Sequence, residues 1–208
     1  MTDHIWMCDA KRYSQFVRGF WADLDDGEPQ VFSRQEKDDT FSKNDMGIPL
    51  ARDRFPEKVY WRNKWKFDKS LPQFFHSGFI FINEKAANIL RDHDLGQGAL
   101  YPVDLFENDR VTPIEANIST LCIGNQKDTV LLDHSENMKR LWPRHDFFSP
   151  ELWVEDDNIL VDRSCLEGPD LWADPKIKNV FFMSDRLGQA LIKARMKNAF
   201  KLVRCRVN

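Results

Sequence analysis

The sequence of 208 residues lacks several features that would assign a protein to a class at once. No run approaches the roughly 20 apolar residues that span a bilayer, and the first residues contain neither the basic nor the apolar segment of a secretion signal. The 30 basic and 33 acidic residues nearly balance, which leaves a formal net charge of −3. We therefore expect a cytoplasmic protein that neither binds nucleic acid directly nor associates with a membrane.

Cysteine is scarce, and recognisable chemical motifs are missing. Cys8, Cys122, Cys165 and Cys205 stand without Cys-x-x-Cys spacing, each in or beside an apolar segment, so we expect buried free thiols and not disulfides. The sequence contains no phosphate-binding Gly-x-x-x-x-Gly-Lys loop, no Gly-x-Gly-x-x-Gly turn and no His-Glu-x-x-His helix. We therefore predict no cofactor, no metal site and no catalytic constellation.

Two stretches about a hundred residues apart share one pattern. Each has a short apolar strand (79–82 and 180–183), a capping residue (Asn83 and Ser184), an amphipathic helix (84–91 and 185–196) and a returning strand (99–105 and 200–207). The pattern predicts an α+β fold over one domain, residues 1–208, in which two similar strand-helix-strand units contribute to a mixed sheet. The expected core includes Phe79, Phe81, Phe181, Leu187, Leu191 and Phe200.

The same two units carry a family resemblance. Phe-Phe-Met-Ser-Asp-Arg-Leu at 181–187 resembles the C-terminal signature of a bacterial family, once a domain of unknown function, of immunity proteins from polymorphic toxin systems. Residues 77–85 resemble the first strand-helix of that family, and residues 130–136 resemble its central Asp-x-Ser segment. The resemblance covers about 61–208, with residues 1–75 as a variable N-terminal part. Asn198 stands where a glycine is expected before the last strand, and asparagine can also form that turn.

The resemblance implies a protein that protects its producing cell. It would bind a co-encoded toxin domain in a stoichiometric complex and block the toxin's active site. An alternative is a small hydrolase or transferase that uses Asp133 or His134. Because adjacent strand residues point to opposite faces, Asp133, His134 and Ser135 cannot form a catalytic triad among themselves. We expect instead that Asp133 or Ser135 caps a helix over residues 136–141.

Two stretches could contact such a partner. Residues 141–153 combine four large aromatic residues with two prolines, and they supply the side-chain types that anchor interfaces: Trp142, Arg144, Phe147, Phe148 and Trp153. The competing interpretation is a loop tucked against the core. An acidic turn supplies a negative rim suited to a basic, nucleic-acid-cutting toxin: Asp23, Asp25, Asp26 and Glu28. Residues 33–53, which follow this turn, are polar and predict a long irregular connection.

Overall fold

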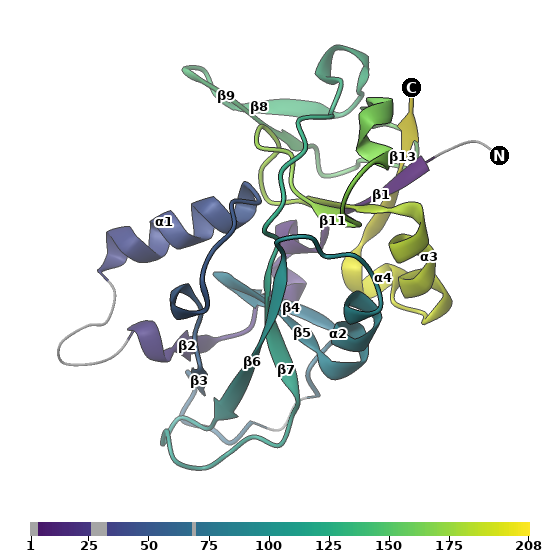
Figure 1. Cartoon of the computed structure of the whole chain (residues 1–208). Coiled ribbons are helices and arrows are strands. Elements are labelled where there is room, and N and C mark those ends of the chain that lie inside the picture. Colours follow the sequence, from purple (N-terminus) through teal and green to yellow (C-terminus); the bar gives the residue numbers. More distant parts are fainter. Residues whose placement is uncertain (1–3, 26–32, 68–69) are drawn as a thin grey trace.

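The computed structural model describes residues 4–25, 33–67 and 70–208, and it arranges the strands in two mixed sheets and one hairpin (Figure 1). In spatial order, the six-stranded sheet contains β2 (Phe20–Ala22), β3 (Lys58–Trp61), β6 (Ala99–Phe106), β7 (Ile118–Cys122), β5 (Phe79–Asn83) and β4 (Phe74–Ser77). The five-stranded sheet contains β10 (Leu160–Val161), β13 (Leu202–Val207), β1 (His4–Cys8), β12 (Phe181–Ser184) and β11 (Leu171–Trp172). The hairpin consists of β8 (Met138–Trp142) and β9 (His145–Pro150).

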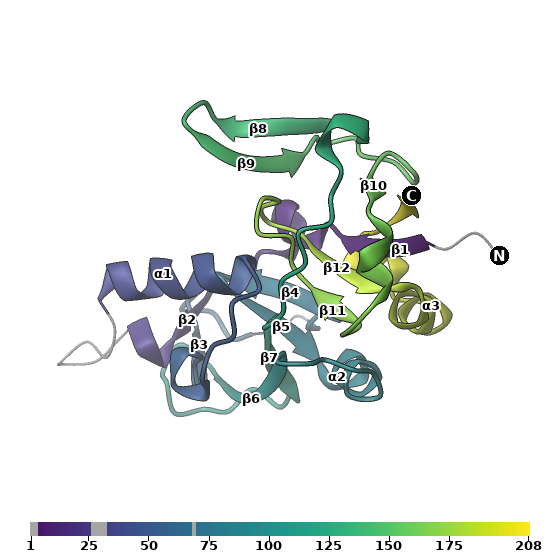
Figure 2. The same ribbon diagram turned by 45° about the horizontal axis from the view of Figure 1, so that its top comes forward.

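Helices complete the α+β fold. Within the described residues the α-helices are α1 (Arg34–Asp45), α2 (Glu84–Arg91), α3 (Asp185–Lys193) and α4 (Lys197–Phe200). Short 3-10 helices join other elements: η1 (Ala10–Arg12), η2 (Ser14–Phe16), η3 (Asp23–Asp25), η4 (Arg52–Arg54), η5 (Leu132–His134) and η6 (Arg163–Leu166). Helices α2 and α3 contact each other and lie side by side in both views, whereas α1 lies apart from them (Figures 1 and 2).

The predicted similarity of the two units extends to whole sheets. Five strands in the order β3-β6-β7-β5-β4 match β10-β13-β1-β12-β11, because each set has one parallel outer pair followed by three antiparallel pairs. Each unit therefore has its own mixed sheet, so the prediction that both units contribute to one sheet is wrong, while the α+β class is confirmed. In the first set the central strand β7 follows β6 along the chain, but in the second set the central strand β1 comes from the N-terminal part.

One hydrophobic cluster, the shared core, joins the two sheets. It contains Ile80 and Ile82 of β5 together with Phe181 and Met183 of β12, and it also includes buried residues of α2 and α3. Alternate residues of the same two strands point to the opposite face of their sheet. Phe79 and Phe81 of β5 enter a second cluster on the six-stranded sheet, and Phe182 of β12 enters a third cluster on the five-stranded sheet. All six residues predicted for the core are at most 3% exposed, so this prediction is confirmed: Phe79, Phe81, Phe181, Leu187, Leu191 and Phe200.

Both predicted caps are present at the starts of α2 and α3. The Asn83 side chain accepts a hydrogen bond from the Ala86 amide at 3.0 Å, and Ser184 Oγ accepts one from the Leu187 amide at 3.3 Å. The predicted turn at Asn198 is wrong, because this residue lies inside α4. The left-handed residue before the last strand is Lys201, with φ at 47°.

The predicted helix over residues 136–141 is also wrong, because most of this stretch forms strand β8. Its residues pair with β9 in an antiparallel ladder, and this pairing overrides the helix propensity of the local sequence. Ser135 starts no helix over residues 136–141 and is instead the C-cap residue of η5. Its hydroxyl donates to the Leu131 carbonyl at 2.9 Å and accepts from the Leu160 amide at 3.0 Å, which fixes the chain just before the hairpin.

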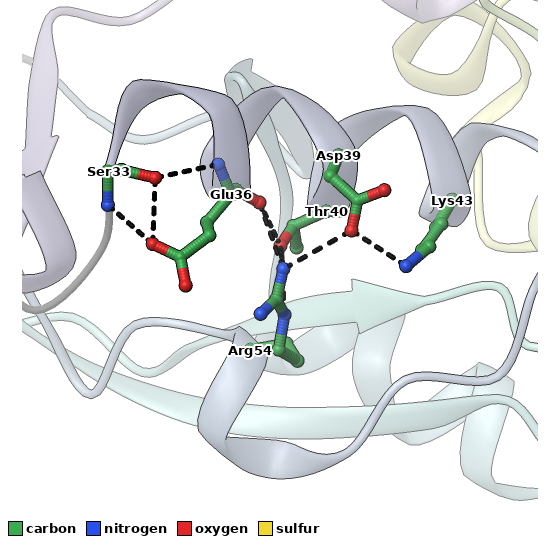
Figure 3. A network of polar contacts seen from close by, with 6 residues as sticks. All are labelled: Ser33, Glu36, Asp39, Thr40, Lys43 and Arg54. Carbon is green, nitrogen blue, oxygen red and sulfur yellow. Dashed lines mark hydrogen bonds and ion pairs between the residues drawn. The ribbon is translucent and has the colours of Figure 1, made fainter.

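Helix α1 replaces much of the irregular connection predicted for residues 33–53. A capping box starts it, in which Ser33 Oγ accepts from the Glu36 amide while the Glu36 carboxylate accepts from the Ser33 amide. Arg54 of η4 then holds the N-terminal half of the helix from the side that faces the sheet, by donating to the Glu36 carbonyl and to Thr40 Oγ1 (Figure 3). Polar contacts therefore position this helix, which has few apolar residues to bury.

A buried amide fixes the other end of α1 to the six-stranded sheet. Asn44 is 5% exposed, its Nδ2 donates to the Leu121 carbonyl at 3.0 Å, and its Oδ1 accepts from the Ile123 amide at 2.9 Å. Since both bonds are buried, loss of this side chain would leave two backbone groups unpaired. Asn44 thus ties α1 to the end of β7.

Candidate partner-binding hairpin

The predicted aromatic stretch forms hairpin β8–β9 and the segment that follows it. Trp142 pairs with His145 across a two-residue turn at Pro143 and Arg144. The register shifts between Arg140 and Trp142, which marks a bulge or irregularity in the ladder there. In both views the hairpin stands at the edge of the molecule, away from α2 and α3 (Figures 1 and 2).

The five predicted anchors differ in exposure. Trp142 is 53% exposed at the end of β8, and Trp153 is 84% exposed just after β9. Arg144 is exposed in the turn, whereas Phe147 and Phe148 are half-buried. Trp142 and Trp153 do not form one patch, because β9 runs between the turn and Trp153.

One aromatic cluster lies near the tip of the hairpin. The Phe147 ring meets the Trp142 ring edge to face, with centroids 6.2 Å apart, and it stacks with the His145 ring at 5.9 Å. On its other side, Lys178 Nζ lies 3.9 Å from the Phe147 centroid. This Nζ is buried without a hydrogen-bond acceptor among the described residues, and burial lowers the pKa of Lys178. Phe147 therefore packs against Trp142 and limits the movement of its ring.

Phe148 belongs to the body of the protein. Its ring packs against the hydrophobic cluster of the five-stranded sheet that contains Val161, Trp172 and Ile177. Its backbone amide donates to the Lys176 carbonyl and its carbonyl accepts from the Lys178 amide, both at 2.8 Å. The interpretation of a segment tucked against the core therefore fits Phe148, while the exposed side chain of Trp142 fits the interface interpretation.

Asp23, the described start of the acidic turn, lies apart from the hairpin. Asp23 begins η3, and its Oδ2 accepts hydrogen bonds from the Glu57 and Lys58 amides at 3.2 and 3.0 Å. Burial raises the pKa of Asp23 despite these bonds. This carboxylate therefore supports the start of β3, and in both views α1 lies between η3 and the hairpin (Figures 1 and 2). Asp26 and Glu28 lie outside the described residues, as does the side chain of Asp25.

The residues of the alternative catalytic site lie on the surface. Asp133 and His134 are both exposed on η5. Ser135 is engaged with the backbone at Leu131 and Leu160, so its hydroxyl is not directed at His134 as a nucleophile. Within the described residues, no three His, Cys, Asp or Glu side chains gather in a group that could ligate a metal ion.

The cysteines agree with the prediction of buried thiols. All four are free and buried: Cys8, Cys122, Cys165 and Cys205. Burial raises the pKa of Cys8, whose Sγ donates to the Phe200 carbonyl, and it also raises the pKa of Cys205. These thiols are therefore structural groups of the core.

No described helix is both long and apolar enough to span a bilayer.

In comparisons with known proteins, no family model matches the chain, and no curated protein matches it.

Proposed function

We propose that this protein is an immunity protein that binds a co-encoded toxin domain one-to-one in the cytoplasm of the producing cell. The resemblance of residues 77–85, 130–136 and 181–187 to an immunity family supports the proposal. The observation that carries it is hairpin β8–β9, which presents a half-exposed tryptophan beside an arginine at its turn. Tryptophan and arginine are the residues that most often dominate the free energy of a protein interface.

The hydrogen bonds that hold the hairpin on the body of the protein fit a binding role. Phe148 ties β9 to residues 176–178 through two backbone hydrogen bonds, and Asp174 fixes the same segment. The Asp174 carboxylate is fully buried and accepts from the amides of Thr129, Val130 and Lys176. A surface that is already ordered loses little conformational entropy on binding, so more of the contact energy appears as affinity.

Co-expression tests the proposal. The chain would be produced with the toxin domain encoded beside its own gene, and cell survival and co-purification would be scored. We expect survival only when the two proteins are made in comparable amounts, together with recovery of a one-to-one complex. Survival at a small fraction of one protein per toxin would contradict stoichiometric binding and would favour an enzyme.

A matched variant addresses the enzymatic alternative. Replacing Asp133 and His134 together by alanine removes the exposed carboxylate and imidazole of η5. We expect the double variant to protect cells as well as the wild type, because neither residue belongs to the hairpin. Loss of protection with a folded protein and an intact complex would instead support hydrolase or transferase chemistry at these residues.

A further inference from the structure

The two edges of hairpin β8–β9 differ. The edge of β9 that faces away from β8 is occupied, because Phe148 forms a parallel bridge with Ile177. The edge of β8 that faces away from β9 makes no backbone hydrogen bond to any described residue. β8 is therefore an open edge strand, whose backbone groups can pair with a further strand.

The hydrogen-bond pattern identifies which backbone groups are free. Phe148 directs both its N–H and its C=O toward residues 176 and 178, so it makes no ladder bond to its partner Arg140. In an antiparallel ladder, the two members of such a pair both point their backbone groups outward. The N–H and C=O of Arg140 therefore face the open edge.

Met138, two residues before Arg140, also directs its N–H and C=O toward the open edge. It lies opposite Pro150, which has no N–H to donate, and alternate residues of a strand share the same direction. Met138 and Arg140 thus offer two donors and two acceptors in a row. The backbone of a partner strand offers both donors and acceptors at the spacing of those on β8, whereas a nucleic acid backbone supplies mainly acceptors.

The charge of the hairpin indicates the chemistry of the added strand. Residues 138–150 contain Lys139, Arg140 and Arg144 but only one acidic residue, Asp146, so their formal charge is +2 with His145 neutral. The whole chain is negative, at −3. Arg140 is half-exposed and pairs with Asp146 at 2.9 Å, which leaves Lys139 and Arg144 for an incoming carboxylate. A strand that carries aspartate or glutamate fits this edge.

We propose that the toxin binds by adding one of its own strands, rich in carboxylates, to the open edge of β8 at Met138 and Arg140. This inference rests on the proposed function and deepens it. The exposed Trp142 lies at the end of the same strand. In the complex its side chain contacts the part of the toxin surface that lies beside the added strand. Pairing of two copies through β8 is disfavoured, because it would bring Lys139 and Arg140 beside their own counterparts.

A pair of substitutions at one position tests strand addition. Arg140→Ala removes the side chain and keeps the outward N–H, whereas Arg140→Pro removes both. Since this N–H makes no ladder bond to β9, proline at this edge position leaves the hairpin pairing intact. We expect both variants to melt within a few degrees of each other, and Arg140→Pro to bind an inactive variant of the co-encoded toxin domain at least about tenfold more weakly than Arg140→Ala does.

Hydrogen exchange of the wild-type protein provides a second readout. The amides of Met138 and Arg140 are expected to exchange rapidly in the free protein and to become protected at least about tenfold in the complex, because each gains an acceptor. The amide of Lys139 points toward β9 and serves as the internal control.

The outcomes separate this inference from the proposed function. If the toxin domain binds the wild type, but the two Arg140 variants bind equally and the two amides stay unprotected, strand addition is overturned and the immunity function stands. If the toxin domain does not bind the wild type, both are overturned. A free protein that dimerises through this edge, or that binds duplex DNA in a manner lost in Arg140→Ala, would also overturn the choice of a toxin strand as the occupant.

Discussion

Phe147 and Phe148 are adjacent in the chain and point to opposite faces of β9. Phe147 contacts Trp142 and Lys178 near the hairpin tip, whereas Phe148 packs into the cluster of the five-stranded sheet. One face of the hairpin thus supports an exposed tryptophan, and the other face attaches the hairpin to the body. Binding and stability can therefore be separated by single substitutions in this segment.

Phe148→Ala should lower the free energy of unfolding by about 2 kcal/mol, somewhat less than the loss for a fully buried phenylalanine, because Phe148 is half-buried. Phe147→Ala should cost about 1 kcal/mol, since it loses the contacts with Trp142 and Lys178 but removes no core residue. Urea unfolding of both variants measures the difference. Equal stability of the two variants would contradict the assignment of the faces.

The two helix caps should differ in strength. Asn83→Ala should cost about 1 kcal/mol, the usual loss for a cap. Ser184→Ala should cost about 2 kcal/mol, because Ser184 Oγ accepts from the Leu187 amide and also donates to the buried Asp170 carboxylate at 2.5 Å. Urea unfolding measures the free energy of unfolding that each variant loses. A larger loss for Asn83→Ala than for Ser184→Ala would show that the hydrogen bond to Asp170 contributes little.

The caps and helix stripes could be predicted from sequence because they depend on residues three or four positions apart. Asn83 and Ser184 cap their helices as expected. The position of β1 could not be predicted in this way. Its pairing with β12 and β13 joins residues about 170 to 200 positions apart, such as Ile5 and Cys205, and no local pattern encodes such a contact.

Two elements were missed for different reasons. Helix α1 has a readable signal, the Ser33 and Glu36 spacing of a capping box, but it lacks the apolar stripe that sequence reasoning looks for. Strand β8 has good helix formers, and only its pairing with β9 makes it a strand. For the site, the sequence identified the aromatic stretch, but the strand pairing decides that Trp142 is exposed and Phe148 is packed.

Gly188→Ala should destabilise the packing of α3 on β1. A Cβ at this position would lie 2.1 Å from Cδ1 of Trp6, whose ring is 5% exposed and cannot move without disturbing the shared core. We expect a loss of about 1–3 kcal/mol in urea unfolding. Gln189→Ala, at the exposed neighbouring position, is the control and should change stability by less than about 0.5 kcal/mol. A gain of stability in Gly188→Ala would contradict this packing.

The Asp170 carboxylate should make stability depend on acid pH. Burial raises its pKa, but hydrogen bonds from Arg186, Ser184 and the Asp94 amide outweigh burial, so the pKa lies below its usual value near 3.8. A lowered pKa means that the folded state favours the charged form. The stabilisation is therefore complete above the unfolded pKa and is lost as pH falls through the folded pKa.

Asp170→Asn measures this contribution. The variant should be less stable than the wild type at pH 6, and the difference in free energy of unfolding should shrink as the pH falls below about 4. Urea unfolding at several pH values between 3 and 6 provides the comparison. A difference that stays constant over this range would show that the charge of Asp170 contributes nothing to stability.

The most direct test of the account is the affinity of Trp142→Ala for the co-encoded toxin domain, measured by calorimetry with an inactive toxin variant. Trp142 is half-exposed, so its loss should leave the melting temperature nearly unchanged. If the hairpin is the interface, the Kd should rise about 30-fold or more, which corresponds to about 2 kcal/mol. Trp65→Ala, at a tryptophan that is 85% exposed outside the hairpin, is the matched control and should bind like the wild type. A folded Trp142→Ala protein that binds the toxin as tightly as the wild type would contradict the account.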